Sequence, residues 1–98
     1  MWFIHPHFFV VKYLFEITAM NNQSKSSHKE KLELLGTILR EIRLKLDLTQ
    51  VQVSIDTGLH INTISNIERG LSCRLDNFII ISSLYELRPS DILAVVEL

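Results

Sequence analysis

The sequence has little of the chemistry that often stabilises small domains through covalent links or metal ions. Among its 98 residues there is a single cysteine, Cys73, which excludes an internal disulfide and a cysteine-based metal cluster. A chain of this length allows one small domain and little more. We therefore expect a core of packed aliphatic side chains and a reducing, cytoplasmic compartment.

An excess of charge of one sign is lacking as well. The acidic and basic residues almost cancel, and the formal net charge is -1. Domains that bind nucleic acids are often basic overall, so this balance argues weakly against such a partner. It does not exclude one, because a local basic face matters more than the total charge.

Patterns typical of enzymes and metal sites are missing from the sequence. It contains no Gly-rich phosphate loop, no paired carboxylates and no catalytic triad. His5, His7 and His28 lack the spacing of metal ligands. Cys73 would need a lowered thiol pKa to act as a redox switch. We expect no enzymatic activity, no cofactor and no metal ion.

The segment 1–19 holds every aromatic residue of the chain except Phe78 and Tyr85. It lacks the basic start of a signal peptide, and it is too short and too charged to span a membrane, so we expect no membrane partner. Alternation over residues 11–17 is compatible with a strand that pairs with another segment or with a second copy of the chain. Alternatively, translation begins at Met20 and the segment has no selected role.

The rest of the chain divides into a polar stretch and a helical domain. Residues 20–30 are polar and without periodicity, which predicts a flexible linker. The N-terminal extension with its linker thus covers residues 1–30, and the folded domain covers residues 31–98. Within this domain, residues 31–46 place their apolar positions on one face of a helix. These positions are Leu35, Ile38, Leu39, Ile42 and Leu46.

Two short helices follow. Thr49 can cap a helix over residues 50–57. This helix ends at Gly58, a residue suited to the left-handed conformation. After a short turn, a further helix runs over residues 61–69 and is stopped at Gly70.

The C-terminal part predicts two more helices. One covers residues 75–85, and Pro89 opens the last, because proline is well tolerated at the first helical position. We expect an inner face on the former helix made by Phe78, Ile79, Ile81 and Ser82. The predicted fold is an all-α bundle of five helices.

The helix over residues 61–69 carries polar side chains along one continuous arc. Asparagine can bond adenine at two points, arginine can bond guanine or a phosphate, and an apolar side chain can touch a thymine methyl. Thr49 and Gln50, at the start of the preceding helix, suit a phosphate oxygen. Two helices joined by a Gly-containing turn in this way describe a helix-turn-helix. The arc consists of Ile61, Asn62, Ser65, Asn66 and Arg69, opposite Ile64 and Ile67.

Four stretches carry a resemblance to a known family. They are LREIR at 39–43, TQVQVSIDTG at 49–58, NTISNIERG at 62–70 and LRPSDIL at 87–93. Residues 35–97 resemble the phage repressor/Cro (XRE-type) helix-turn-helix family. The resemblance implies a DNA-binding bundle of the phage-repressor type.

The resemblance also implies roles for individual residues. Gln50 would contact a backbone phosphate, and Glu68 would form a buried ion pair with Arg43. The alternative for Glu68 is a solvated residue at a helix end. Bases would be read by His60, Ile61, Asn62 and Asn66. The candidate DNA-binding residues are Thr49, Gln50, His60, Ile61, Asn62, Thr63, Ser65, Asn66 and Arg69.

Several positions depart from the family pattern. Ser54 replaces a common alanine and still permits close helix approach, whereas Thr57 replaces an aliphatic residue with its methyl group. Leu75 stands near a frequent proline. His60 stands where a serine or threonine cap is expected, so the amides that follow would lose a good acceptor. His60 is then either a DNA contact or simply a poor cap.

The expected function is that of a sequence-specific DNA-binding transcriptional regulator, a repressor that acts as a dimer on a palindromic operator. One alternative is an activator, such as the controller of a restriction–modification system. Another is an antitoxin-like protein-interaction module that docks a partner through residues 1–19. The last helix has more apolar residues than one face needs, which suggests a dimer contact there. These residues are Leu87, Ile92, Leu93, Val95 and Val96.

Overall fold

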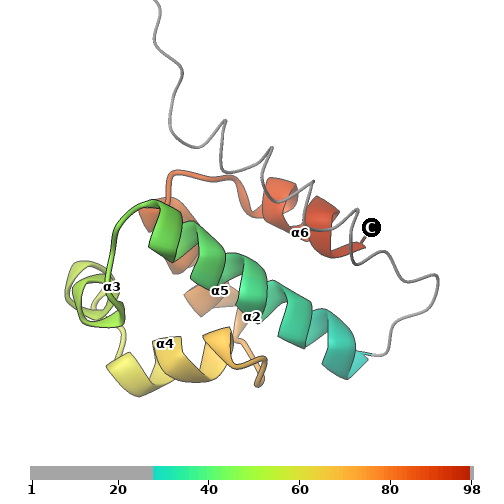
Figure 1. Ribbon diagram of the computed structural model, residues 1–98, viewed down its shortest axis with the longest axis horizontal. Coiled ribbons are helices and arrows are strands. Elements are labelled where there is room, and N and C mark those ends of the chain that lie inside the picture. Colours follow the sequence, from blue (N-terminus) through green and yellow to red (C-terminus); the bar gives the residue numbers. More distant parts are fainter. Residues whose placement is uncertain (1–27, 98) are drawn as a thin grey trace, which may run out of the picture.

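The computed structural model describes residues 28–97, and all regular secondary structure within them is helical (Figure 1). The predicted all-α bundle of five helices is confirmed for these residues. The first helix already starts at His28 rather than at residue 31. The strand considered within 1–19, and the predicted linker as far as residue 27, lie outside the described residues. The helices are α2 (His28–Lys45), α3 (Gln50–Thr57), α4 (Ile61–Glu68), α5 (Leu75–Leu84) and α6 (Pro89–Glu97).

The longest helix, α2, lies at the centre of the bundle (Figure 1). It packs against α4 and α6, whereas α3 packs against α4 and α5, and α5 packs against α6. Within the consecutive pair α3 and α4, helix α4 is therefore supported by α2, and helix α3 is supported by α5. These contacts hold the pair against the rest of the bundle.

All five helices contribute aliphatic side chains to one core, which Phe78 and Tyr85 complete. The predicted inner face of α2 is buried, except that Leu46, just after the helix, is only partly buried against the core. α4 contributes Ile64 and Ile67, as its amphipathic pattern predicts. Each such Leu or Ile contributes about 1.5–3 kcal/mol through removal from water, so packing rather than covalent links stabilises this domain.

The helix ends follow short-range rules that the sequence displays. Thr49 caps α3, because its hydroxyl accepts a hydrogen bond from the backbone N–H of Gln52. Gly58 ends α3 with a φ of 78°, and Gly70 follows α4 with a φ of 85°. Asp47, between α2 and α3, also adopts a positive φ, of 63°. The left-handed stop predicted at Gly58 is thus confirmed, and α4 ends two residues before the predicted stop at Gly70.

The inner face of α5 differs from the prediction at one residue. Phe78, Ile81, Ser82 and Tyr85 are buried, whereas Ile79 is 48% exposed. The spacing i, i+3, i+4 and i+7 of the buried residues defines one stripe, and Ile79 lies about 100° away from Phe78 around the helix axis. The placement of Ile79 on the inner face is therefore wrong.

The apolar surplus predicted on α6 is mostly used inside the domain. Ile92 and Val95, together with Leu87 just before the helix, are buried in the core, and Val96 packs partly against it. Leu93 alone of this group is strongly exposed, at 42%. None of the helices within residues 28–97 is long and apolar enough to cross a membrane.

Candidate nucleic-acid interface

The turn between α3 and α4 is held by two hydroxyl groups. The Ser54 hydroxyl donates to the Leu59 carbonyl oxygen at 2.6 Å. The Thr57 hydroxyl donates to the Val53 carbonyl oxygen at 2.6 Å and accepts from the Leu59 N–H at 3.2 Å. Both residues depart from the family pattern, and both tie Leu59 of the turn to the last turn of α3. The sequence analysis assigned a role only to the small size of Ser54 and the methyl group of Thr57, and it did not predict the hydrogen bonds of their hydroxyl groups.

His60 caps α4, contrary to the prediction. Its side chain accepts a hydrogen bond from the Asn62 N–H at Nδ1, at a distance of 3.0 Å. The expectation that the amides at the start of α4 would lose a good acceptor is therefore wrong. A neutral imidazole has one nitrogen without a proton, and this nitrogen can replace the oxygen of serine or threonine at a cap.

The outward arc of α4 is presented as its periodicity predicts. Asn62, Asn66 and Arg69 are exposed, and Ile61, Thr63 and Ser65 are half-buried. The Arg69 guanidinium donates to the Asn66 side-chain oxygen at 3.1 Å, which orients these two polar groups relative to each other. The opposite side of α4 faces the core. The side of α4 that is free to enter a DNA groove therefore carries amides and a guanidinium.

Arg43 and Glu68 form the buried ion pair that the resemblance implies. Arg43 Nε lies 2.8 Å from Glu68 Oε2, and Arg43 Nη2 lies 3.0 Å from Glu68 Oε1. Arg43 Nη1 also donates to the Leu48 carbonyl oxygen at 2.9 Å. Both residues are at least nine-tenths buried. The hydrogen bond to Glu68 raises the pKa of Arg43 in spite of the opposing effect of burial.

This ion pair joins α2 to α4, the second helix of the motif. Arg43 belongs to α2, Glu68 ends α4, and Leu48 lies in the connection that leads to α3. The solvated alternative for Glu68 is thereby excluded. Because a bidentate arginine–carboxylate contact has a fixed geometry, it sets the position of α4 relative to α2.

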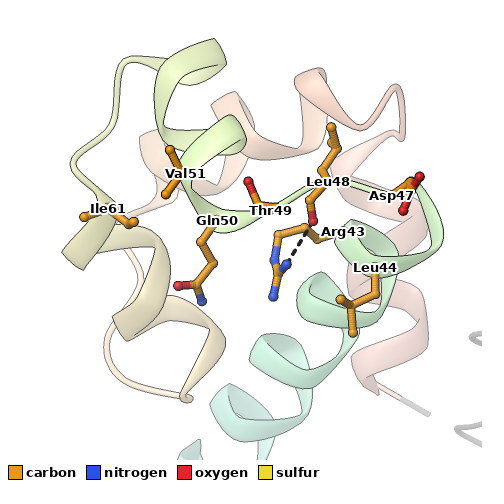
Figure 2. A pocket seen from close by; sticks show the side chains of 8 residues that line it. All are labelled: Arg43, Leu44, Asp47, Leu48, Thr49, Gln50, Val51 and Ile61. Atoms are coloured by element: carbon orange, nitrogen blue, oxygen red, sulfur yellow. Dashed lines mark hydrogen bonds between the residues drawn. The ribbon is translucent and has the colours of Figure 1, made fainter.

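Gln50 takes part in the same network, which the sequence did not indicate. Its side-chain Nε2 donates to Glu68 Oε1 at 3.0 Å. Gln50 and Arg43 also line a pocket of about 390 Å³ at the start of α3, and Figure 2 shows their side chains extending in the same direction. The residues that line this pocket are Arg43, Leu44, Asp47, Leu48, Thr49, Gln50, Val51 and Ile61. Three of them, Thr49, Gln50 and Ile61, are predicted DNA contacts, so the structure brings both helices of the motif to one place.

The surroundings of Cys73 and Arg74, which lie after the motif, bear on the roles that these residues can have. Burial raises the pKa of the Cys73 thiol, and the nearby Asp76 carboxylate raises it further. The thiolate that a redox switch requires is thus disfavoured. Arg74 forms an exposed ion pair with Asp76 at 3.0 Å. Within residues 28–97, no group of three or more His, Cys, Asp or Glu side chains is placed to hold a metal ion.

Comparison with known proteins agrees with this geometry. The family model for the helix-turn-helix matches residues 39–92, which is more than half of the chain. No curated protein and no solved structure matches the chain. The matched residues include the whole α3–α4 pair, the ion pair that braces it and the arc that it presents. The chain is a DNA-binding transcription regulator that belongs to the helix-turn-helix family of the XRE, or phage repressor-like, type.

Proposed function

We propose that this regulator is a repressor that binds a palindromic operator as a two-fold dimer. The observation that carries the proposal is the exposed arc of Asn62, Asn66 and Arg69 on a helix braced by a buried ion pair. Amides and a guanidinium are the groups that distinguish base pairs in the major groove. Because the ion pair and the packed core hold α4 in one position, these groups would meet the bases in one register, which favours sequence-specific binding over general affinity.

Backbone phosphates would be contacted from the start of α3. Thr49 caps this helix, and Gln50 is its first residue. The N-terminus of a helix carries partial positive charge and free N–H groups, both of which suit a phosphate oxygen. Contacts of this kind position the protein on the duplex, while the residues of α4 read the bases.

A second copy of the chain is the proposed partner. The packed helices α5 and α6 expose several large apolar side chains to solvent. For the two α4 helices to enter successive major grooves, a symmetric contact between such surfaces must hold them about 34 Å apart, one turn of DNA. This contact would include α5 as well as α6, since most apolar residues of α6 are already buried in the domain. The exposed residues are Leu75, Ile79, Ile80 and Leu93.

Selection of fragments from random double-stranded DNA tests the DNA-binding part of the proposal. We expect the full chain to enrich an inverted repeat with half-sites about 10 base pairs apart. Placing the enriched site across a promoter should then lower transcription of a reporter gene. Enrichment of a single unrepeated site would reject the dimer, and a rise in transcription would favour an activator.

Light scattering of the full chain tests the dimer directly. We expect the mass of two chains at a protein concentration on the order of tens of micromolar, which is enough to populate a dimer of moderate affinity. Ile79→Lys with Leu93→Lys should convert it to a monomer. The matched control is Ile55→Lys, which changes an exposed isoleucine on α3 and should leave the mass unchanged.

A further inference from the structure

One carboxylate joins the three helices that make up the DNA-binding side of the domain. Glu68 Oε2 accepts from Arg43 Nε at 2.8 Å. Glu68 Oε1 accepts from Arg43 Nη2 and from Gln50 Nε2, and both of these distances are 3.0 Å. These three residues belong to α4, α2 and α3 respectively. The phosphate-contacting candidate Gln50 is thus tied to the same group that braces the base-reading helix.

The chemistry of this contact decides how the Gln50 amide is turned. A primary amide has a donating nitrogen end and an accepting oxygen end, and the two differ little in shape. A carboxylate only accepts, so Glu68 selects the nitrogen end. One N–H of Gln50 is used in this bond, and the direction of the second N–H is fixed with it. A phosphate oxygen also only accepts, and it therefore requires an N–H in a defined position.

We propose that Glu68 is a positioning residue for DNA backbone binding, because through Gln50 it holds an amide N–H in place for a phosphate oxygen. This inference rests on the proposed role of Gln50 in phosphate contact. It gives the Arg43–Glu68 pair a second consequence besides stability. The same carboxylate that sets the position of α4 also sets the phosphate contact at the start of α3. The base contacts of α4 and the phosphate contact of Gln50 are therefore both positioned by Glu68.

The test is a double-mutant cycle on the full chain, measured as affinity for the duplex that the native chain selects. Gln50→Ala removes the proposed contact. Arg43→Met combined with Glu68→Leu removes the anchor, and replacement of a whole buried ion pair by apolar residues usually preserves folding. Circular dichroism and thermal melting verify that each variant is folded before its affinity is compared.

Coupling between the two changes is the expected result. Gln50→Ala should lower affinity roughly tenfold in the native background and less than about twofold once the ion pair is replaced. The matched control is Gln52→Ala, which changes the neighbouring exposed glutamine whose amide bonds Asp56 instead. Its effect should be the same in both backgrounds.

Two outcomes of the binding measurements overturn the inference. An equal loss from Gln50→Ala in both backgrounds would mean that Gln50 acts without Glu68, while the proposed function would stand. A native chain that selects no duplex would reject the proposed function and this inference together. If the ion-pair replacement does not fold, Glu68→Gln serves in its place, and amide-proton NMR of the Gln50 side chain in the free protein reports the bond. Identical, rapid exchange of these protons in the native chain and in Glu68→Gln would also overturn it.

Discussion

Gly36 of α2 lies directly against the backbone of α4 at Glu68. A Cβ atom added to Gly36 would lie 2.6 Å from the Glu68 carbonyl oxygen, and it would also meet the Ile67 carbonyl oxygen. Real Cβ atoms do not approach carbonyl groups so closely, so only glycine allows the two helices their present separation. This separation brings Arg43 of α2 within reach of Glu68 and thereby sets the position of the DNA-reading helix.

Gly36→Ala is therefore expected to destabilise the domain. Alanine in a helix interior is favoured over glycine by about 1 kcal/mol, but the clash is with the backbone and cannot be relieved by a change of rotamer. We expect a net loss of roughly 1–3 kcal/mol in the free energy of unfolding, measured by urea denaturation. Thr37→Ala, at the neighbouring exposed position of α2, should change it by no more than about 0.5 kcal/mol. A Gly36→Ala variant as stable as the native chain would contradict the close contact.

Removal of one member of the buried ion pair should be severe. Glu68→Ala leaves the Arg43 charge buried without its carboxylate, and we expect a loss of about 3–5 kcal/mol in the free energy of unfolding. Arg88→Ala breaks an exposed pair with Asp91 and should cost about 0–1 kcal/mol. Chemical denaturation of both variants provides the comparison. Similar small losses for the two would show that the Arg43–Glu68 pair is solvated.

The imidazole of His60 is expected to stabilise the start of α4. His60→Ala removes the acceptor for the Asn62 N–H and should cost about 0.5–2 kcal/mol in the free energy of unfolding. His60→Ser supplies an oxygen at the same cap and should restore most of this loss. If alanine and serine are equally stable at this position, the cap contributes nothing. Thermal melting of the two variants beside the native chain decides between these results.

Base contacts and phosphate contacts on α4 should separate experimentally. Asn62→Ala is expected to relax the preference at one base pair and to cost roughly 1–3 kcal/mol in binding free energy there. Arg69→Ala, if the guanidinium contacts a phosphate, should weaken all duplexes alike and lower the salt slope by about 1. Affinity for a series of operator variants at several salt concentrations measures both effects. A uniform loss for Asn62→Ala would remove that residue from base reading.

Tyr85 should make the domain sensitive to alkali. Burial, together with the nearby negative charge of Glu68, raises the pKa of the Tyr85 phenol above its ordinary value of 10.0. The unfolded chain releases this proton near pH 10, whereas the folded chain retains it. The contribution of Tyr85 to stability is therefore complete below about pH 10 and is lost as the pH rises further, by up to about 1.4 kcal/mol per pH unit.

Tyr85→Phe supplies the comparison for this pH dependence. The variant has no phenol to titrate, so its free energy of unfolding should fall less steeply between about pH 10 and pH 12. Urea denaturation across this range, on both chains, isolates the contribution of Tyr85 because all other groups are shared. Parallel curves for the two chains would place the phenol in contact with water.

Much of the fold follows from short-range patterns in the sequence. The bounds of α3, its threonine cap and its left-handed glycine agree with the prediction, as does the buried face of α2. These features depend on residues within one or two helical turns of each other, so periodicity and cap chemistry are sufficient. The polar arc of α4 is of the same kind.

The sequence by itself determined which helices form, which faces they bury and that one polar arc points outward. Only the tertiary structure decided that Gly36 meets the backbone of α4 and that Gln50 shares the carboxylate of Glu68. The partners in this last bond are separated by 18 positions in the chain. Such a contact depends on the distance and angle between packed helices, and these are set by the whole core rather than by the residues that make the contact.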